Sequence, residues 1–540
     1  MAACGALWGQ VPAFDWGQFT RADSLRGTLS PQRSCFDVHH YDLRLRIDVE
    51  NRHISGSNAV HFRVVEPFVN FQLDLFDNLR VEKIVHRGKA VKFEREGHAI
   101  FVQLEKTLAP GSLDSVRVFY SGKPRVAPKA PWDGGFVWSQ DEHGRPWVGV
   151  ACEGLGASVW WPLKDHLADE PDSVSAAFET PENLVCVSNG RKIAETRLGD
   201  GFVRTVWKTR APINSYNLTV NIADYAHFSD TLNGENGVLT LDYYVLSDRL
   251  GKAQKHFKQV KPMMRCYEKH FGPYPFYEDG YKLVETPYWG MEHQSCVAYG
   301  NNYKNDAVFN FDFIIIHETG HEWFGNSVST DDHGELWIHE ALTTYAEAVY
   351  LECRYDYPTA VNYLRRQKER IQFVEPIQGP RDVNFDAFAT SDMYMKGAWM
   401  FHTLRSVVAD DDRWFRTLRK FCTDFHRKSV RSKTVVEWFG RELTGKPDGL
   451  QSFFDVYLNA VQPPTLEYVW QTPPEGPVLS YRWAEAGLAM PVDVYVRDGV
   501  KIRLKPTSQP QTLQDDRFSV KSFRVDEDSF LVKAKLKDKW

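Results

Sequence analysis

The sequence predicts a multidomain α+β protein in which an antiparallel β-sandwich comes first, a mainly helical domain follows, and a small β domain comes last. Three observations lead to this prediction. A chain of 540 residues is too long for one hydrophobic core. The spacing of apolar residues changes from every second position to every third or fourth position near residue 246. It returns to every second position after residue 465.

The segment 37–245 is predicted to be the β-sandwich domain, because apolar and polar side chains alternate along much of it. In the stretch HYDLRLRI the apolar residues are Tyr41, Leu43, Leu45 and Ile47. Strands with one apolar and one polar face typically form antiparallel sheets that pack on their apolar sides. Residues 1–36 precede this pattern and are predicted to be an N-terminal tail.

The segment 246–465 is predicted to be mainly helical, with one helix marked by apolar residues at helical spacing. These residues are Ala253, Phe257, Val260, Met264, Tyr267 and Phe271. The stretch FGPYP ends that helix, and PPT at 463–465 marks the next break. Renewed alternation at Val492, Val494 and Val496 indicates a small β domain over 466–540.

Composition and charge exclude several classes of partner. With 43% hydrophobic and 25% charged residues, the chain has the composition of an ordinary globular protein. A net charge of −6 provides no basic surface, so we expect no nucleic-acid partner. No stretch reaches the roughly 18 apolar residues of a membrane span, so we expect no transmembrane segment. The eight cysteines are scattered without a CxxC pair, so we expect reduced, isolated thiols.

The first residues are compatible with two cellular locations. The stretch MAACGALWGQ contains small and apolar residues, but it has no basic segment and its apolar run is too short for a signal peptide. We therefore expect either a cytoplasmic protein or one exported to the bacterial cell envelope by a signal upstream of this start. The sequence carries no indication of the oligomeric state.

The stretch FIIIHETGHEWFGN, residues 313–326, places ionisable side chains inside an apolar run. In a strand, His317 and His321 would lie about 13 Å apart. In a helix they lie one turn, about 6 Å, apart. Zinc binds imidazole nitrogens at about 2.0–2.1 Å, so two histidines one turn apart can bind one ion. The spacing therefore predicts a helix with two zinc ligands, against the alternative of two core histidines.

A third ligand is expected from the following helix. A catalytic zinc site uses three protein ligands and keeps a fourth position for water. The stretch ELWIHEALTTYAE supplies Glu340, with 18 residues between it and His321. Alone, Glu340 is more typical of a solvated helix carboxylate, but beside HETGH it is predicted to be a ligand. We expect one Zn²⁺ per chain, on His317, His321 and Glu340.

These motifs resemble those of gluzincin metallopeptidases. HEWFGN and LWIHEALTTYAE are similar to the alanyl-aminopeptidase family in particular, whose members include the puromycin-sensitive enzyme and leukotriene epoxide hydrolase. Three further segments agree in order: ACEG (151–154), WGMEH (289–293), which resembles the GxMEN motif, and YMKG (394–397), which resembles Y-x-K-G. The resemblance covers residues 37–470. It implies a thermolysin-like catalytic domain and zinc-dependent removal of N-terminal residues from peptides.

The resemblance also implies catalytic roles, and each is chemically reasonable. Glu318 would take a proton from the attacking water and pass it to the leaving amine. Tyr394 would donate its hydroxyl to the oxyanion of the tetrahedral intermediate. Glu347 would orient a ligand histidine through its second ring nitrogen.

The remaining motif residues are expected to bind the substrate. The resemblance places Gly290, Met291 and Glu292 in the exopeptidase motif and Glu153 in the upstream segment that helps to hold the substrate's amine. Two carboxylates in a pocket with little water would pair with the free α-ammonium of a peptide. Peptides with a free N-terminus are therefore the expected substrates.

The chain departs from the family pattern at several positions. His293 and His339 replace the usual asparagines, Ala151 stands where an amide is common, and only about 75 residues follow the catalytic part instead of a long helical domain. The alternative functions are an endopeptidase or an epoxide hydrolase on the same zinc site. A further alternative is a non-catalytic β-rich binding protein with a vestigial site.

Overall fold

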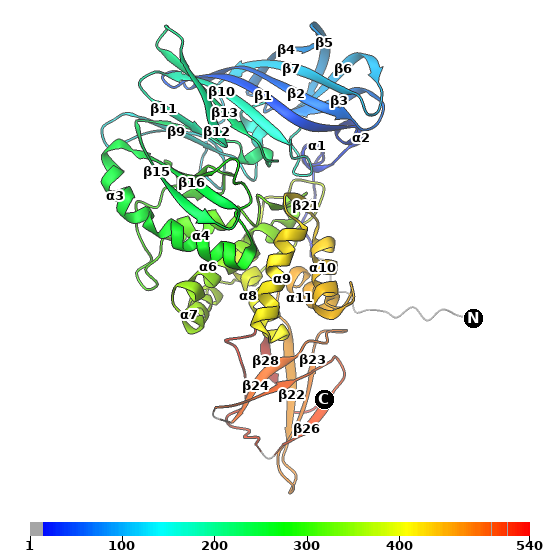
Figure 1. Cartoon of the computed structure of the whole chain (residues 1–540). Coiled ribbons are helices and arrows are strands. Elements are labelled where there is room, and N and C mark those ends of the chain that lie inside the picture. The colour runs from blue at the N-terminus through cyan, green and yellow to red at the C-terminus, as the bar shows by residue number, and fades with distance from the viewer. Residues whose placement is uncertain (1–13, 498, 516) are drawn as a thin grey trace, which may run out of the picture.

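The computed structural model describes residues 14–497, 499–515 and 517–540, and its three parts follow one another in space (Figure 1). A β-rich domain lies at one end, a mainly helical domain in the middle and a small β domain at the other end. The predicted multidomain α+β organisation is therefore confirmed. Within the part of the chain that is described, no helix is both long and apolar enough to cross a membrane.

The N-terminal domain is built on a large sheet with the strand order β12-β13-β10-β1-β2-β7-β4-β5-β6-β3. Its strands are β1 (Phe36–Asp48), β2 (His53–Val64), β3 (Phe68–Asp74), β4 (Leu79–His86), β5 (Lys89–Glu96), β6 (Ala99–Leu108), β7 (Leu113–Gly122), β10 (Ser173–Pro181), β12 (Arg191–Arg197) and β13 (Phe202–Thr209). A smaller sheet has the order β11-β14-β9-β8. Its strands are β8 (Gly135–Gln140), β9 (Pro146–Ala151), β11 (Val185–Ser188) and β14 (Val220–Ala223).

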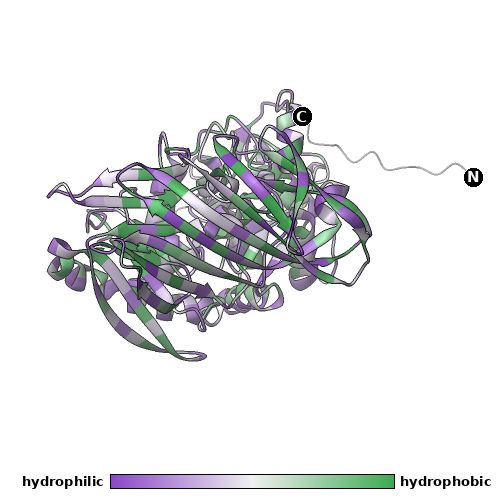
Figure 2. Cartoon of the chain, turned by 90° about the horizontal axis from the view of Figure 1, so that it is seen from above, coloured by the Kyte–Doolittle hydropathy of each residue, from purple (hydrophilic) through white to green (hydrophobic). Residues whose placement is uncertain are grey.

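Alternation along the strands explains why these sheets pack against each other. Figure 2 shows hydrophobic and hydrophilic residues alternating along the strands. In β1 the residues Tyr41, Leu43, Leu45 and Ile47 are all buried, as the sequence predicts. The large sheet differs from the prediction in one pairing, because β1 and β10 run parallel. A long connection separates these two strands, and such a crossover allows parallel pairing.

The described part of the predicted N-terminal tail is structured. It forms α1 (Arg21–Gly27), which begins with a capping box between Thr20 and Asp23, and α2 (Pro31–Ser34). The guanidinium of Arg33 is fully buried and lies 2.7 Å from a carboxylate oxygen of Asp74 in β3. This ion pair fixes the segment to the first domain. Residues 1–13 lie outside the described residues.

The middle domain begins earlier than the sequence indicates. The hairpin β15 (Tyr225–Gly234) and β16 (Gly237–Leu246) joins a sheet of order β15-β16-β17-β19-β18, through parallel pairing of β16 with β17 (Tyr281–Glu285). The other two strands are β18 (Gly290–Met291) and β19 (Val297–Tyr299). Alternation in the sequence assigns 225–245 to the first domain, because it reveals a strand but not the sheet that the strand joins.

Helices form the rest of the middle domain and surround the segment with the predicted metal ligands. They are α3 (Leu250–His256), α4 (Val260–Phe271), α5 (Phe313–Gly320), α6 (Trp337–Arg354), α7 (Tyr357–Lys368), α8 (Asp392–Val408), α9 (Asp411–Asp424), α10 (Ser432–Thr444) and α11 (Gln451–Asn459). Two short strands, β20 (Val328–Thr330) and β21 (Lys428–Val430), pair in parallel. Helix α6 packs on both α5 and α8.

The C-terminal domain consists of two small sheets. One has the order β26-β23-β22-β28, and its strands are β22 (Thr465–Gln471), β23 (Val478–Trp483), β26 (Gln511–Gln514) and β28 (Lys533–Leu536). The other has the order β25-β24-β27, and its strands are β24 (Val492–Arg497), β25 (Val500–Leu504) and β27 (Arg524–Val525). Hydrogen bonds connect this domain to α8 and α11. In α8, the imidazole of His402 lies 2.9 Å from the carbonyl oxygen of Asp528. In α11, the Tyr457 hydroxyl donates to the carbonyl oxygen of Leu531 at 2.8 Å.

One cysteine pair corrects the expectation of isolated thiols. Cys266 in α4 and Cys353 in α6 form a disulfide with an S–S distance of 2.13 Å. The two residues are 87 positions apart in sequence, so only the packing of α4 on α6 brings them together. The other cysteines of the described chain are free and buried: Cys35, Cys152, Cys186, Cys296 and Cys422. Cys4 lies outside the described residues.

Candidate active site

The segment with the HETGH motif forms helix α5, as its spacing predicts. Its first turn is capped by Asp312, whose carboxylate accepts a hydrogen bond from the backbone N–H of Ile314 at 3.0 Å. The Asn301 amide and the Tyr299 hydroxyl hold that carboxylate in place at 2.8 and 2.7 Å. The β-branched residues 314–316 are buried, so tertiary packing overrides their preference for strands.

The three predicted metal ligands meet at one point. The Nε2 atoms of His317 and His321 are 3.2 Å apart, and each lies 3.4–3.5 Å from Oε2 of Glu340 in the first turn of α6. A tetrahedral zinc with bonds of about 2.0–2.2 Å separates its ligand atoms by about 3.3 Å. Oε2 of Glu340 is buried and has no hydrogen-bond partner within the described residues. The donor set therefore fits one zinc ion.

Protein hydrogen bonds orient both imidazoles toward this point. Nδ1 of His317 lies 2.6 Å from Oε1 of Glu347, one of the residues predicted from the sequence. The second oxygen of Glu347 accepts from the Gln367 amide at 2.9 Å and from the Tyr363 hydroxyl. Nδ1 of His321 donates to the carbonyl of Phe324 at 2.9 Å. Each Nε2 lone pair is thus left for a metal.

Glu318 projects from the same helix turn toward β18. Its carboxylate, that of Glu292 and the imidazole of His321 offer ligand atoms within 4.8 Å of one another. A Cβ atom on Gly290 would lie 2.5 Å from Oε1 of Glu318, so any larger residue here would displace that carboxylate. Burial raises the pKa of the Glu318 carboxyl above its usual value.

The two carboxylates predicted to hold an amine lie together. Glu153, Glu292 and His339 have ligand atoms within 4.8 Å of one another. Burial, and then repulsion by Glu292, raise the pKa of Glu153 well above its usual value. Oε1 of Glu153 has no hydrogen-bond partner in the described part of the chain. A cation placed between these groups would give Oε1 of Glu153 a hydrogen-bond partner and would offset the repulsion between the two carboxylates.

Sequence reasoning missed a residue of the first domain that contacts this pair. The Tyr216 hydroxyl donates to Oε1 of Glu292 at 3.1 Å. Beside it, the Asn217 amide donates to Asn326 at 2.7 Å, and the amide of Asn326 donates to the carbonyl of Glu292 at 2.8 Å. Tyr216 is 76 residues from Glu292 and belongs to no motif, so no sequence signal identifies it.

Tyr394 reaches the site from α8. Its ring stacks on the imidazole of His317 with centroids 5.9 Å apart. The other residues of the YMKG motif position this helix: the Lys396 ammonium donates to the carbonyl of Ala460 at 2.5 Å, and a Cβ atom on Gly397 would clash with that of Ala341. Gly397 therefore allows α8 to pack tightly on α6. Burial raises the pKa of Tyr394, so its hydroxyl keeps its proton for donation.

The histidines that replace the usual asparagines are neutral. Burial lowers the pKa of His293 to about 3 and that of His339 to about 3. Nε2 of His339 accepts a hydrogen bond from the backbone N–H of Thr330 at 2.9 Å. Neither ring therefore carries a positive charge that would compensate Glu292 or Glu340.

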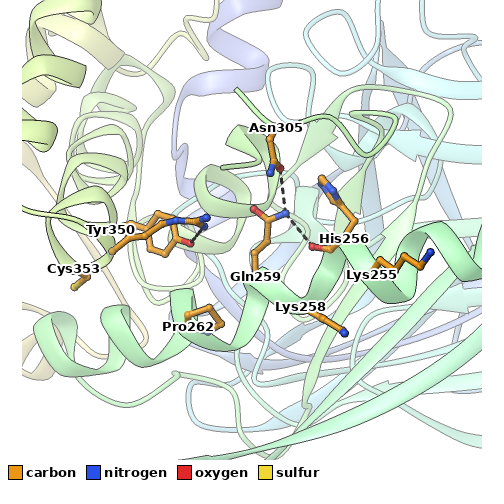
Figure 3. Close-up of a pocket in the computed structure, with 9 residues that line it drawn as sticks. Lys255, His256, Lys258, Gln259, Pro262, Asn305, Tyr350 and Cys353 are labelled. Atoms are coloured by element: carbon orange, nitrogen blue, oxygen red, sulfur yellow. Dashed lines mark hydrogen bonds between the residues drawn. The ribbon is translucent and has the colours of Figure 1, made fainter. Parts of the chain in front are cut away.

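A sizeable cavity lies elsewhere in the domain and contains none of these residues (Figure 3). It has a volume of about 560 Å³ and is lined by Lys255, His256, Lys258, Gln259, Pro262, Asn305, Tyr350, Cys353 and Arg354. The Gln259 amide donates to the carbonyl of His256 at 3.0 Å. The candidate active site is therefore identified by its cluster of metal-binding and ionisable side chains, and not by the size of a cavity.

Comparisons with known proteins agree with this site. A model described as "Peptidase family M1 domain" matches residues 256–457, and one described as "Peptidase M1 N-terminal domain" matches residues 38–217. The fold and the donor set define a metallopeptidase architecture. The chain belongs to the M1 peptidase family, which confirms the resemblance seen in the motifs.

Curated relatives are similar over part of their length. Mouse aminopeptidase B is 25% identical over 310 residues, which cover 53% of this chain and 45% of the relative. Leucine aminopeptidase 2 of Vanderwaltozyma polyspora is 23% identical over 431 residues, covering 75% of this chain and 63% of the relative. The match therefore spans less than two thirds of either relative.

A solved structure has the same fold. The M1 zinc metallopeptidase of Deinococcus radiodurans, solved as a point mutant bound to a Tyr-Ser-Ala substrate, aligns with a TM-score of 0.65 at 20% identity. The alignment covers 79% of this chain and 95% of that one. At this identity the comparison establishes the fold.

Proposed function

We propose that the chain is a zinc-dependent aminopeptidase that hydrolyses the N-terminal peptide bond of peptides. The observation that carries the proposal is the triangle of His317, His321 and Glu340, whose donor atoms are 3.2–3.5 Å apart beside a pair of carboxylates. The names of the curated relatives support aminopeptidase activity, and the name of the Deinococcus structure supports a zinc-dependent peptidase.

Each side chain has a task in this reaction. A zinc ion held by the triangle would polarise the scissile carbonyl and acidify a water molecule. Glu318 takes a proton from the attacking water and delivers it to the leaving amine, since its buried carboxylate lies beside the triangle. The Tyr394 hydroxyl, whose ring is stacked against His317, donates a hydrogen bond to the developing oxyanion.

The carboxylates of Glu153 and Glu292 select the amino end of the substrate. The two carboxyl groups lie close together, and Oε1 of Glu153 has no hydrogen-bond partner among the described residues. An α-ammonium group would supply that partner and would favour the ionised form of both carboxyls. Tyr216 holds Glu292 in place by its hydrogen bond. Because these groups adjoin the metal ligands, a substrate whose ammonium they bind would be cut close to its amino end.

The test is hydrolysis of a panel of fluorogenic amino-acid amides, with metal analysis of the same preparations. We expect about one zinc per chain, loss of activity with a chelator, and recovery when zinc is added back. Hydrolysis by protein that contains no zinc and resists chelators would contradict the proposal. Absence of hydrolysis by the zinc-loaded protein would also contradict it.

We also propose that the chain works in an oxidising compartment. Disulfides persist in secreted and envelope proteins and are rare in the cytosol, so the Cys266–Cys353 bond favours export to the cell envelope over a cytoplasmic location. Mass spectrometry of protein alkylated before cell lysis would check this. We expect a peptide linked through Cys266 and Cys353, and alkylation of both residues would exclude the proposal.

A further inference from the structure

A row of aromatic side chains leads from the metal ligands to the protein surface. Phe313 stacks on His317 with centroids 5.1 Å apart, Trp289 stacks on Phe313 at 5.5 Å, and Trp132 lies 6.0 Å from Trp289. Exposure rises along the row, from 5% at His317 to 45% at Trp289 and 58% at Trp132. We name Trp132, Trp289 and Phe313 the aromatic row. The aromatic row therefore connects the predicted metal ligands with the exposed surface of the protein.

The aromatic row and the amine-binding carboxylates lie at opposite ends of the metal site. Strand β18 runs in the same direction as α5. A Cβ atom on Gly290 would lie 2.8 Å from Ile314 and 2.5 Å from Glu318, and Glu292 groups with Glu318 and His321. Trp289 precedes Gly290 and contacts Phe313, at the start of α5. The carboxylate pair therefore adjoins the end of α5, and the aromatic row adjoins its beginning.

This arrangement sets the direction of a bound peptide. With the α-ammonium at Glu153 and Glu292 and the scissile bond at the metal ligands, the chain after the cut extends toward Trp289. An extended peptide advances about 3.3 Å per residue, so the first two or three residues after the cut run along the aromatic row. Exposed aromatic faces bind aromatic and large apolar side chains by stacking and burial.

Polar contacts hold the Trp289 ring and the loop that carries Trp132. The indole N–H of Trp289 donates to Asn301 at 3.3 Å, and Asn301 in turn bonds to Asp312, the cap of α5. The loop of Trp132 is closed by an ion pair of 2.7 Å between Arg125 and Asp133. A fixed surface loses little conformational entropy when a peptide binds.

We propose that the aromatic row binds the segment of the substrate that follows the scissile bond and selects peptides with aromatic or large apolar side chains there. This inference rests on the aminopeptidase function proposed above. It adds a preference for particular side chains in the residues that follow the scissile bond, in addition to any preference for the residue that is removed. Trp132 and Trp289 are thus specificity-determining residues.

The test compares two tripeptides, Leu-Phe-Phe and Leu-Gly-Gly, with leucinamide as a substrate that has nothing beyond the cut. We expect kcat/KM to be at least about tenfold higher for Leu-Phe-Phe than for Leu-Gly-Gly, mainly through KM, since stacked aromatic pairs contribute that much to binding. Trp289→Ala combined with Trp132→Ala should remove most of this ratio. Trp540→Ala is the matched control, because Trp540 is also exposed (44%) but lies in the C-terminal domain.

Binding provides a second readout that needs no turnover. Calorimetry of the Glu318→Gln variant should show weaker binding of Leu-Gly-Gly than of Leu-Phe-Phe, and the difference should disappear when both tryptophans are replaced. Equal kcat/KM and equal affinity for the two tripeptides would overturn the proposal, as would a ratio that survives the double substitution. Failure to hydrolyse leucinamide would reject the aminopeptidase function instead, and the calorimetric comparison would still decide the role of the row.

Discussion

His317 and His321 each use Nδ1 for a hydrogen bond to the protein and leave Nε2 for a metal. Glu340 has one oxygen directed at the same point, without another partner among the described residues. Glu318 follows His317 directly, so its side chain leaves the helix in another direction and lies beside the triangle. At the scale of single residues, the proposed ligand and proton-transfer roles are therefore separated by position on one helix turn.

Replacing Glu318 with glutamine should abolish turnover while leaving the metal bound. The amide has nearly the same shape but cannot accept the proton of water, and general bases typically contribute about 10²–10⁴-fold. Steady-state kinetics and zinc content of the same sample check this. Retention of more than about a tenth of the activity would remove Glu318 from the proton-transfer role.

Replacing Tyr394 with phenylalanine should lower kcat far more than it raises KM. The hydroxyl is expected to act on the oxyanion, which exists only near the transition state, whereas the ring that stacks on His317 is retained. The measurement is kcat and KM with one unblocked peptide. An effect limited to KM would assign Tyr394 to binding of the ground state.

At the scale of elements, close helix packing builds the site. α6 carries Glu340 and Glu347, α5 carries the histidines, and α8 brings Tyr394 close because Gly397 allows contact with Ala341. α4 supports both α5 and α6: the Tyr267 hydroxyl donates to the carbonyl of Ile316 at 3.0 Å, and Cys266 is bonded to Cys353. The disulfide therefore fixes a helix that backs the metal ligands.

Loss of the disulfide should destabilise the helical domain. A bond that closes a loop of 87 residues typically contributes about 2–4 kcal/mol, which corresponds to a Tm lower by roughly 5–10 °C. Calorimetry of Cys266→Ser combined with Cys353→Ser should show this loss. A reductant should lower the Tm of the wild type and leave that of the variant unchanged. A wild-type Tm that does not respond to reductant under unfolding conditions would contradict the account.

The sequence predicts helices, strands and their buried faces well, but it predicts contacts between distant segments poorly. The helix of the HETGH motif and the burial in β1 follow from spacing within a few residues. The placement of β15 and β16, the disulfide and the contact of Tyr216 with Glu292 all depend on segments that are distant in sequence. The same holds for the aromatic row, because Trp132 and Trp289 belong to different domains.

At the scale of the whole molecule, two domains supply the candidate active site and the third lies apart (Figure 1). The first domain contributes Glu153 and Tyr216, and the helical domain contributes the metal ligands. The interface is closed by polar contacts, including a hydrogen bond of 3.1 Å from Asn214 to the carbonyl of Gly325. The two carboxylates proposed to bind the substrate's amine thus come from both sides of a domain interface, so the proposed specificity depends on both domains.

The measurement that tests this account most directly compares kcat/KM for one peptide with a free N-terminus and for its acetylated form. Acetylation removes the cation that Glu153 and Glu292 are expected to bind, and the loss of a buried charged partner costs several kcal/mol. We predict that the acetylated peptide reacts at least about a hundredfold more slowly, and that Glu292→Ala reduces this difference by impairing only the free peptide. Equal values of kcat/KM for the two peptides in the wild type would contradict the account and would indicate an endopeptidase on the same metal site.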